Sequence, residues 1–386
     1  MSMTVSAVKA DLYGRDRYDM AAFVFGPEVT MAGVFTQNAF CAAPVHVARA
    51  HLAGQPRAWL INTKSANAGT GEIGHQDALD VCAAFATQVG LNADQVLPFS
   101  TGVIGERLPL EKIHAALPEL ATDGHDWASA AQGIMTTDTR PKQAQFTGEV
   151  DGVSLTIEGI AKGSGMIQPN MATMLGFVVT NAKIAQADLQ AALSASANTS
   201  FNRITVDGDT STNDACMLAA TGGGPALGPD SPQWSAFIEG LNQVMVELAQ
   251  AIVRDGEGAT KFVEIQVAGA ASEEDAHQVA KTVAHSPLVK TALFASDANW
   301  GRILAAVGRA PIAGLDVSKV QIWIGDVKLV SQGAVDPDYT EQAGAAVFAQ
   351  SDISIRIDLG AGQGETTVWT CDFSHEYVSI NADYRS

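Results

Sequence analysis

The sequence has few basic residues and no cluster of them. Its 386 residues include 23 Lys and Arg against 42 Asp and Glu, which gives a net charge of −19. A surface that binds nucleic acid or an anionic membrane is therefore not expected, although a local Lys or Arg can still attract a small anion into a pocket. No apolar run approaches the ~20 residues that span a bilayer, and charges interrupt the first twenty residues too often for a signal peptide.

Cysteine is also scarce. The four cysteines lie far apart, and no two have the spacing of a Cys-x-x-Cys pair. This usage predicts buried, reduced thiols in a cytoplasmic protein, not a disulfide framework. The eight histidines are scattered, with neither an HExxH motif nor a compact Cys/His set, so no metal site is expected.

The common signatures of hydrolases, nucleotide-binding proteins and calcium-binding proteins are missing. The sequence contains neither GxSxG nor GxxxxGK[ST], and VDGDTSTND lacks the glycine and the closing glutamate of a calcium loop. Gly360, Gly362 and Gly364 follow one another too closely for a dinucleotide fingerprint and fit a hairpin turn better. The sequence therefore gives no sign of a histidine-assisted nucleophile, a metal centre or a bound nucleotide cofactor.

The composition is that of a well-packed protein. Hydrophobic residues make up 47% of the chain and charged residues 17%, and this length suits two domains or one large layered unit. Strand-like runs rich in β-branched and aromatic residues recur along the chain. They include residues 20–26, 29–36, 57–63, 174–181, 320–325 and 353–360.

Helical patterns lie between these strands. Apolar residues recur at helical spacing over 234–253, Ser272 with three acids after it predicts the start of another helix, and 301–309 predicts a short one. The segment ISIRIDLG-AGQGE-TTVWTCDFS predicts an antiparallel hairpin. The interleaved elements predict an α+β or mixed α/β fold in layers, with residues 120–145 as a surface connection.

One segment, KGSGMIQPNMATMLGF at residues 162–177, places Thr173 before an apolar run with no histidine near it. A threonine hydroxyl needs a base, and the α-amino group of a chain that begins with threonine can serve as one, since its pKa is about 7.7–8.0. An internal threonine reaches that state if its hydroxyl attacks the preceding carbonyl and water then hydrolyses the resulting ester.

The residues around Thr173 suit such a cut. Ala172 places little bulk beside the carbonyl, Gly163 and Gly165 permit unusual backbone angles, and Pro169 favours a turn. The apolar run would anchor the new terminus in a buried strand. From this segment alone, an ordinary loop that enters a core strand remains an alternative, and for isolated short motifs it is the commoner case.

The segment KGSGMIQPNMATML resembles the self-cleaving segment of the ornithine acetyltransferases, the glutamate N-acetyltransferase family of arginine biosynthesis. Other blocks resemble that family in the same order and cover nearly the whole chain: AGVFTQNAFCAAPV, STGVIGERLP, IMTTDT, SFNRITVDGDTSTND, RDGEGATKF, SDANWGRILAAVGR and YVSINADYRS. The resemblance implies stacked α and β layers, a fold shared with the self-processing β-aminopeptidases. It also implies cleavage between Ala172 and Thr173 into an α chain (1–172) and a β chain (173–386), assembled as a heterotetramer of two each.

The resemblance also implies the site residues. Thr173 matches the nucleophile, and Thr101 with Gly102 matches the oxyanion hole. The substrate-binding positions are Thr136, Lys162, Thr173, Glu257, Asn381 and Ser386, where Thr136 is chosen over Thr137. Without the resemblance, Lys162 and Glu257 would be interpreted as solvated charges, and Thr101–Gly102 as a tight turn. Asn381 and Ser386 would be interpreted as part of a frayed tail.

Two departures from the family pattern stand out. Ser386 replaces the more usual terminal threonine, which keeps the hydroxyl and loses a methyl group. Lys64 and Ser65 in NTKSANAGTG depart from an NSGNANA-type block, which leaves the shape of that loop in doubt.

The implied activity is ping-pong acetyl transfer from N-acetylornithine to glutamate through an acetyl-threonine enzyme, with acetyl-CoA as an open second donor. An N-terminal-threonine amidohydrolase or aminopeptidase of the same fold is the alternative enzyme. A non-enzymatic binding or assembly protein that stays in one piece is the alternative from another class.

Overall fold

The computed structural model describes residues 3–122, 124, 126–168 and 174–383. The chain divides into two compact units. Unit 1 comprises residues 1–202 and 209–252, and unit 2 comprises 203–208 and 253–386.

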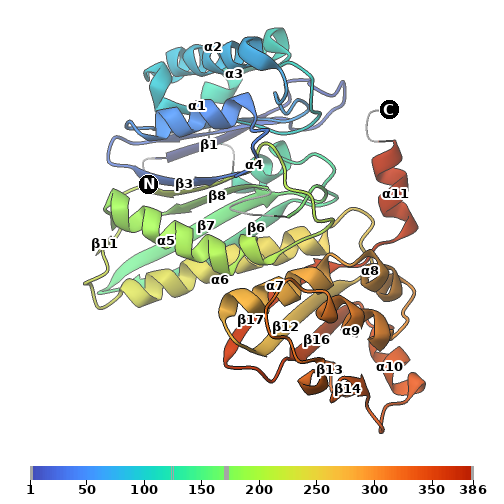
Figure 1. Cartoon of the computed structure of the whole chain (residues 1–386). Helices are drawn as coiled ribbons and strands as arrows, with labels where there is room; N and C mark the ends of the chain where they lie inside the picture. The colour runs from blue at the N-terminus through green and yellow to red at the C-terminus, as the bar shows by residue number, and fades with distance from the viewer. Residues whose placement is uncertain (1–2, 123, 125, 169–173, 384–386) are drawn as a thin grey trace. The chain divides into compact units, whose positions relative to one another are not determined.

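Unit 1 begins with a four-stranded sheet in the order β1-β2-β4-β5. Its strands are β1 (Met3–Val8), β2 (Met20–Phe25), β4 (Ala58–Asn62) and β5 (Val96–Ser100). The helices α1 (Ala43–Leu52), α2 (Gly71–Val89) and α3 (Leu110–Thr122) lie on one side of this sheet (Figure 1). Apolar residues of these helices and of the facing side of the sheet form one buried cluster.

The second sheet of unit 1 has the order β3-β10-β8-β7-β6. Its strands are β3 (Thr30–Phe35), β6 (Lys142–Val150), β7 (Val153–Lys162), β8 (Leu175–Thr180) and β10 (Ala215–Ala220). The helices α5 (Gln186–Thr199) and α6 (Trp234–Arg254) lie on its outer side (Figure 1). Unit 1 also contains α4 (Trp127–Gly133), the short pair β9 (Lys183–Ile184) and β11 (Ala226–Leu227), and η1 (Ala93–Gln95).

The two sheets of unit 1 pack face to face through aromatic side chains. The ring of Phe177 on β8 lies 5.4 Å from that of Trp59 and 5.0 Å from that of Phe99, measured between centroids. Every residue of β8 is buried, because sheet covers one side of it and helices the other. The expected stacked α and β layers are therefore confirmed, as is the buried strand after residue 173.

Unit 2 is built on one six-stranded sheet in the order β15-β14-β13-β16-β12-β17. The strands are β12 (Phe262–Ala270), β13 (Gln321–Ile324), β14 (Val327–Ser331), β15 (Ala334–Val335), β16 (Asp352–Asp358) and β17 (Gly364–Cys371). The helices are α7 (Glu273–Ala284), α8 (Pro287–Phe294), α9 (Trp300–Gly308), α10 (Glu341–Phe348) and α11 (His375–Ala382). Two short 3-10 turns are η2 (Phe201–Arg203), at the boundary of the units, and η3 (Val317–Lys319).

The hairpin expected between β16 and β17 is wrong. The strands run in opposite directions, but β12 lies between them, parallel to β16 and antiparallel to β17. The glycines of the connection serve this crossing: a Cβ on Gly362 would lie 2.4 Å from the carbonyl oxygen of Ala270 at the end of β12. The connection thus passes closely over the end of a third strand.

Most other expected elements are confirmed. The six strand-like runs contain β2, β3, β4, β8, β13 and β16, and helices α6 and α9 lie where the periodicity predicts. The side chain of Ser272 accepts a hydrogen bond from the amide of Asp275 at the start of α7. The expected surface connection at 120–145 is wrong, because it contains α4 and the fully buried side chains of Asp138 and Lys142. No helix in the described part of the chain combines the length and the apolarity needed to cross a membrane.

Candidate active site

The Thr101–Gly102 turn follows directly after β5 in unit 1. Thr101 is 8% exposed, and its amide donates to the carbonyl of Asn62 at 3.1 Å. Gly102 has φ +135°, and a Cβ there would lie 2.2 Å from the carbonyl oxygen of Lys64. Only glycine fits this position, because both its backbone angle and its neighbour exclude a side chain.

The loop that contains Lys64 and Ser65 packs against this turn. Lys64 has φ 75°, and its carbonyl accepts from the amide of Val103 at 2.9 Å. The Ser65 hydroxyl donates to the carbonyl of Glu106 at 2.8 Å and accepts from the amide of Asn67 at 3.1 Å. The two unusual residues therefore form an ordered loop that supports the Thr101–Gly102 turn.

Lys162 is the last residue of β7, where it pairs with Leu175 at the start of β8. Its side chain is half-buried, and Nζ donates to the hydroxyl of Thr101 at 3.1 Å. Because the Thr101 oxygen accepts this bond, its own hydrogen is directed elsewhere and remains able to donate. The structure thus joins two predicted site residues that are 61 positions apart.

Thr136 and Thr137 lie in the loop between α4 and β6. The amide of Thr136 donates to Asp138 Oδ2 at 3.0 Å, and the Thr137 hydroxyl lies 2.6 Å from that of Ser164. The Thr137 hydroxyl is therefore engaged within the fold, and the choice of Thr136 as the residue for substrate stays a prediction.

Asp138 is a residue that the sequence analysis missed. Lys142 Nζ lies 2.6 Å from Asp138 Oδ1, and neither side chain is more than 1% exposed. Burial alone would raise the pKa of Asp138, but the charges of Lys142 and Lys162 and the amide of Gly163 hold it at about 2. The carboxylate is therefore ionised at neutral pH. Its place in IMTTDT, among residues that resemble a known family, was the only signal in the sequence.

The predicted cleavage site, between Ala172 and Thr173, lies outside the described residues, and so does Ser386. The next residue, Met174, is bonded on both sides: its amide donates to the carboxyl of Asp214, and its carbonyl accepts from the amide of Ala215 at 3.0 Å. Complete burial raises the pKa of Asp214 well above its ordinary value. This second missed residue, Asp214, is thus a buried carboxyl bonded to the residue that directly follows the predicted nucleophile.

Unit 2 contains the predicted binding residues Glu257 and Asn381. Glu257 follows α6 and is 7% exposed, and Asn381 Nδ2 donates to its Oε2 at 2.8 Å. A Cβ on Gly258 would lie 2.6 Å from the amide of Tyr377, so glycine lets this loop approach α11 closely. Asn381 therefore belongs to an ordered helix, and the frayed tail considered for it is not observed.

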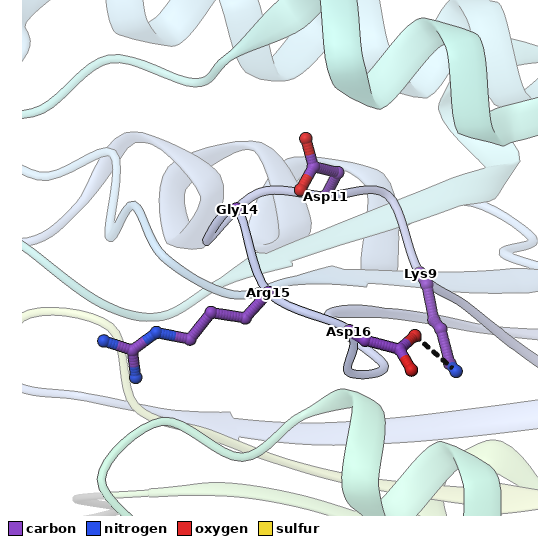
Figure 2. Close-up of a pocket in the computed structure, with 5 residues that line it drawn as sticks. All are labelled: Lys9, Asp11, Gly14, Arg15 and Asp16. Atoms are coloured by element: carbon purple, nitrogen blue, oxygen red, sulfur yellow. Dashed lines mark hydrogen bonds and ion pairs between the residues drawn. The ribbon is translucent and has the colours of Figure 1, made fainter.

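A polar hollow of about 340 Å³ lies elsewhere in unit 1, on the loop after β1. Figure 2 shows Lys9 directed toward Asp16, with 2.7 Å between Nζ and Oδ1, and Arg15 extending away from them. Asp11 and Gly14 complete the lining. The hollow contains none of the predicted site residues, so we do not assign the chemistry to it.

The described residues contain no group of three or more His, Cys, Asp and Glu that could hold a metal ion. The four cysteines are free thiols; Cys82, Cys216 and Cys371 are buried, and Cys41 is half-buried. Burial raises the pKa of Cys216 to about 12, so this thiol is protonated at neutral pH.

The arrangement in unit 1 is that of an enzyme site that can stabilise a negative oxygen. The Thr101 hydroxyl and the Lys162 ammonium group meet at the turn after β5, where the next residue, Gly102, has positive φ.

A sequence model of the ArgJ family matches residues 4–386. The arginine biosynthesis bifunctional protein ArgJ of Methylococcus capsulatus is 56% identical over 379 residues, which cover 97% of this chain and 92% of that protein. The protein of the same name from Pseudomonas syringae pv. tomato is 55% identical and covers 92% of this chain and 89% of its own length. The crystal structure of arginine biosynthesis bifunctional protein ArgJ from Bacillus halodurans is 41% identical, with a TM-score of 0.51, and covers 54% of this chain and 99% of that one. The chain belongs to the ArgJ family.

Proposed function

We propose that this chain is an acyltransferase of arginine biosynthesis, a glutamate N-acetyltransferase that moves an acetyl group from N-acetylornithine to glutamate. Membership of the ArgJ family supports the reaction class. The 3.1 Å bond from Lys162 to Thr101 is the structural observation that carries the proposal, because it places a cation and two oxyanion donors together. No resident cofactor is part of this reaction.

The proposed enzyme first cuts itself. The Thr173 hydroxyl attacks the carbonyl carbon of Ala172, the peptide nitrogen leaves as the free α-amine, and an ester joins the two residues. Water hydrolyses the ester and releases the β chain with Thr173 at its start. The crystal structure from Bacillus halodurans supports this step, because nearly all of that chain (99%) matches only 54% of this one. The expected β chain, 214 of 386 residues, is a similar share of this chain.

Acetyl transfer then proceeds in two halves. The α-amine of Thr173 takes the hydroxyl proton as the oxygen attacks the acetyl carbonyl of N-acetylornithine. The carbon–nitrogen bond breaks, the proton passes to the departing ornithine amine, and an acetyl ester remains on Thr173. The amine of glutamate attacks this ester and leaves as N-acetylglutamate, while the threonine oxygen recovers a proton.

The turn after β5 would stabilise both tetrahedral intermediates. The Thr101 hydroxyl and the Gly102 amide donate to the developing oxyanion, an interaction often worth ~3 kcal/mol per donor. Lys162 holds the Thr101 oxygen from the other side and would attract a substrate carboxylate. Glu257 would bind a substrate ammonium group, with Asn381 fixing its carboxylate; Thr136 and Ser386 complete the proposed binding set.

The test is a product assay on purified protein with N-acetylornithine, with and without glutamate. We expect N-acetylglutamate to form only when both are present, and no product from Thr173→Ala. An amidohydrolase or aminopeptidase would instead release acetate at the same rate with or without glutamate, which would contradict the proposal. A non-enzymatic protein would give neither product and would remain one band of 40.2 kDa on a denaturing gel.

Three further features are proposed with this function. Acetyl-CoA acts as a second acetyl donor beside N-acetylornithine, and parallel assays of the two donors with glutamate test this. Two α and two β chains form the assembly, which native mass spectrometry tests. The free thiols fit a reducing compartment such as the cytoplasm, and cell fractionation tests that location.

A further inference from the structure

Asp138 connects two segments that carry proposed binding residues. Its Oδ2 accepts from the amide of Thr136 at 3.0 Å, and its Oδ1 accepts from the amide of Gly163 at 2.8 Å. Gly163 directly follows Lys162 at the end of β7. One carboxylate therefore ties the loop after α4 to the strand end from which Lys162 reaches Thr101.

A second contact reinforces the same connection. The hydroxyl oxygens of Thr137 and Ser164 are 2.6 Å apart. Thr137 directly follows Thr136, and Ser164 lies two positions after Lys162, so this bond joins the same two segments. Gly163 has φ +147°, and a Cβ there would lie 2.9 Å from Ile167. The backbone can therefore present its amide to Asp138 in this way because residue 163 is glycine.

The carboxylate is kept charged inside the protein by nearby cations. Lys142 bonds to Oδ1 at 2.6 Å, and the charge of Lys162 also acts on Asp138. A buried ion pair often adds little net stability compared with apolar residues of similar volume. The Asp138–Lys142 pair lies between the segments that carry Thr136 and Lys162, and we therefore look for a role beyond stability.

We propose that Asp138 is a positioning residue for the acetyl transfer, which sets the Thr136 loop and the Lys162 end of β7 relative to each other. The inference rests on the proposed function for its kinetic consequence. Its structural part, the ordering of the two amides by one carboxylate, does not depend on what reaction follows.

The experiment compares three variants with the wild type. Asp138→Asn removes the charge, Asp138→Asn with Lys142→Met removes both charges and leaves no unpaired ion, and Asp77→Asn is the matched control. Asp77 is also a buried acid of unit 1, 4% exposed and bonded to Arg107 at 2.6 and 2.9 Å, but it belongs to α2. If Asp138→Asn fails to fold, the double variant carries the test.

The readouts are amide hydrogen exchange at Thr136 and Gly163, and the steady-state constants of acetyl transfer. Asparagine keeps one acceptor oxygen and has an NH2 group in place of the other. In the double variant we therefore expect at least one of the two amides to exchange about tenfold faster and KM for N-acetylornithine to rise about tenfold, the effect of one lost hydrogen bond to a charged group. Asp77→Asn should lower the melting temperature and leave KM and both amides unchanged.

Wild-type protection and wild-type KM in the folded double variant would overturn the inference. The same changes in Asp77→Asn would also overturn it, because they would show a general loss of stability. If the wild type transfers no acetyl group, the proposed function fails on its own, while the exchange of the two amides still decides whether Asp138 orders these segments.

Discussion

The buried acid Asp138 in unit 1 and two buried bases in unit 2 respond to burial in opposite ways. In unit 1, Asp138 lies against Lys142 and near Lys162, and these charges hold its pKa at about 2. In unit 2, burial lowers the pKa of Lys281 to about 7 and that of His285 to about 3, and neighbouring cations add to both shifts. Asp138 in unit 1 therefore keeps its charge by pairing, although Asp214 in the same unit does not, whereas burial and neighbouring cations disfavour the charged forms of Lys281 and His285 in unit 2.

The proposed site residues of the two units differ in the same way. Those of unit 1 are tied together by Asp138 and by the bond between Lys162 and Thr101. In unit 2, Glu257 receives a bond from Asn381, which is exposed on a helix that has no buried residue. We infer that changes in the Thr101–Gly102 turn should affect turnover, changes around Asp138 and Glu257 should affect binding, and changes in the core of unit 2 should affect pH stability.

The largest effect is expected at Gly102. In Gly102→Ala the new Cβ would lie 2.2 Å from the Lys64 carbonyl oxygen. The turn must therefore move, and the amide of residue 102 no longer donates to the oxyanion. We expect kcat for acetyl transfer to fall about 100- to 1000-fold, the usual effect of losing one such donor.

Gly105→Ala is the matched control, because Gly105 also has positive φ, +86°, but a Cβ there meets nothing within 4 Å. Gly105→Ala should introduce the same kind of backbone strain as Gly102→Ala without displacing the Thr101–Gly102 turn. Equal losses of kcat in the two variants would show that strain, not the position of the Gly102 amide, explains the effect.

A smaller effect, on binding, is expected at Asn381. Asn381→Ala removes the 2.8 Å bond to Glu257 and should raise KM about tenfold, or about 1.4 kcal/mol, with kcat nearly unchanged. Steady-state kinetics checks this, with Ser379→Ala, another exposed position on α11, as the control. A fall in kcat at constant KM would contradict the proposed contrast between the Gly102 turn and the Glu257–Asn381 contact.

The last expected effect does not involve catalysis and is a change in how stability depends on pH. His285 has a pKa of about 3 in the folded protein, chiefly through burial, against about 6.5 when unfolded. The unfolded state therefore binds more protons below pH 6.5, and stability falls as the pH drops toward 3. The contribution of Asp138 lies in a lower window: it is present above pH ~3.9 and is lost toward pH 2.

His285→Gln, which cannot gain this proton, should make urea unfolding midpoints fall less between pH 6.5 and pH 4 than in the wild type. His114→Gln on the exposed side of α3 should follow the wild type. Parallel curves for all three proteins would show that protonation of His285 does not contribute to acid sensitivity.

The sequence predicted elements better than it predicted their partners. The apolar period of α6 and the β-branched run of β8 are local signals, and both elements lie where expected. The pairing of β16 with β12 depends on contacts between distant segments, and glycines that suggested a hairpin turn serve a crossing over Ala270 instead.

For the site, the resemblance supplied positions such as Thr101 and Lys162, which the structure joins. It did not reveal Asp138 or Asp214, because an acid within a polar loop has the same local pattern whether it is solvated or buried. Their burial depends on which strands surround them, and that is set by the tertiary fold.

The central claim is that Thr173, freed by cleavage, carries the acetyl group. Intact-mass analysis of the wild type with N-acetylornithine alone tests it most directly. We predict two chains, with one acetyl group on the chain that begins at Thr173, lost when glutamate is added. An active protein that remains a single 40.2 kDa chain, or a β chain that is never acetylated during turnover, would contradict the account.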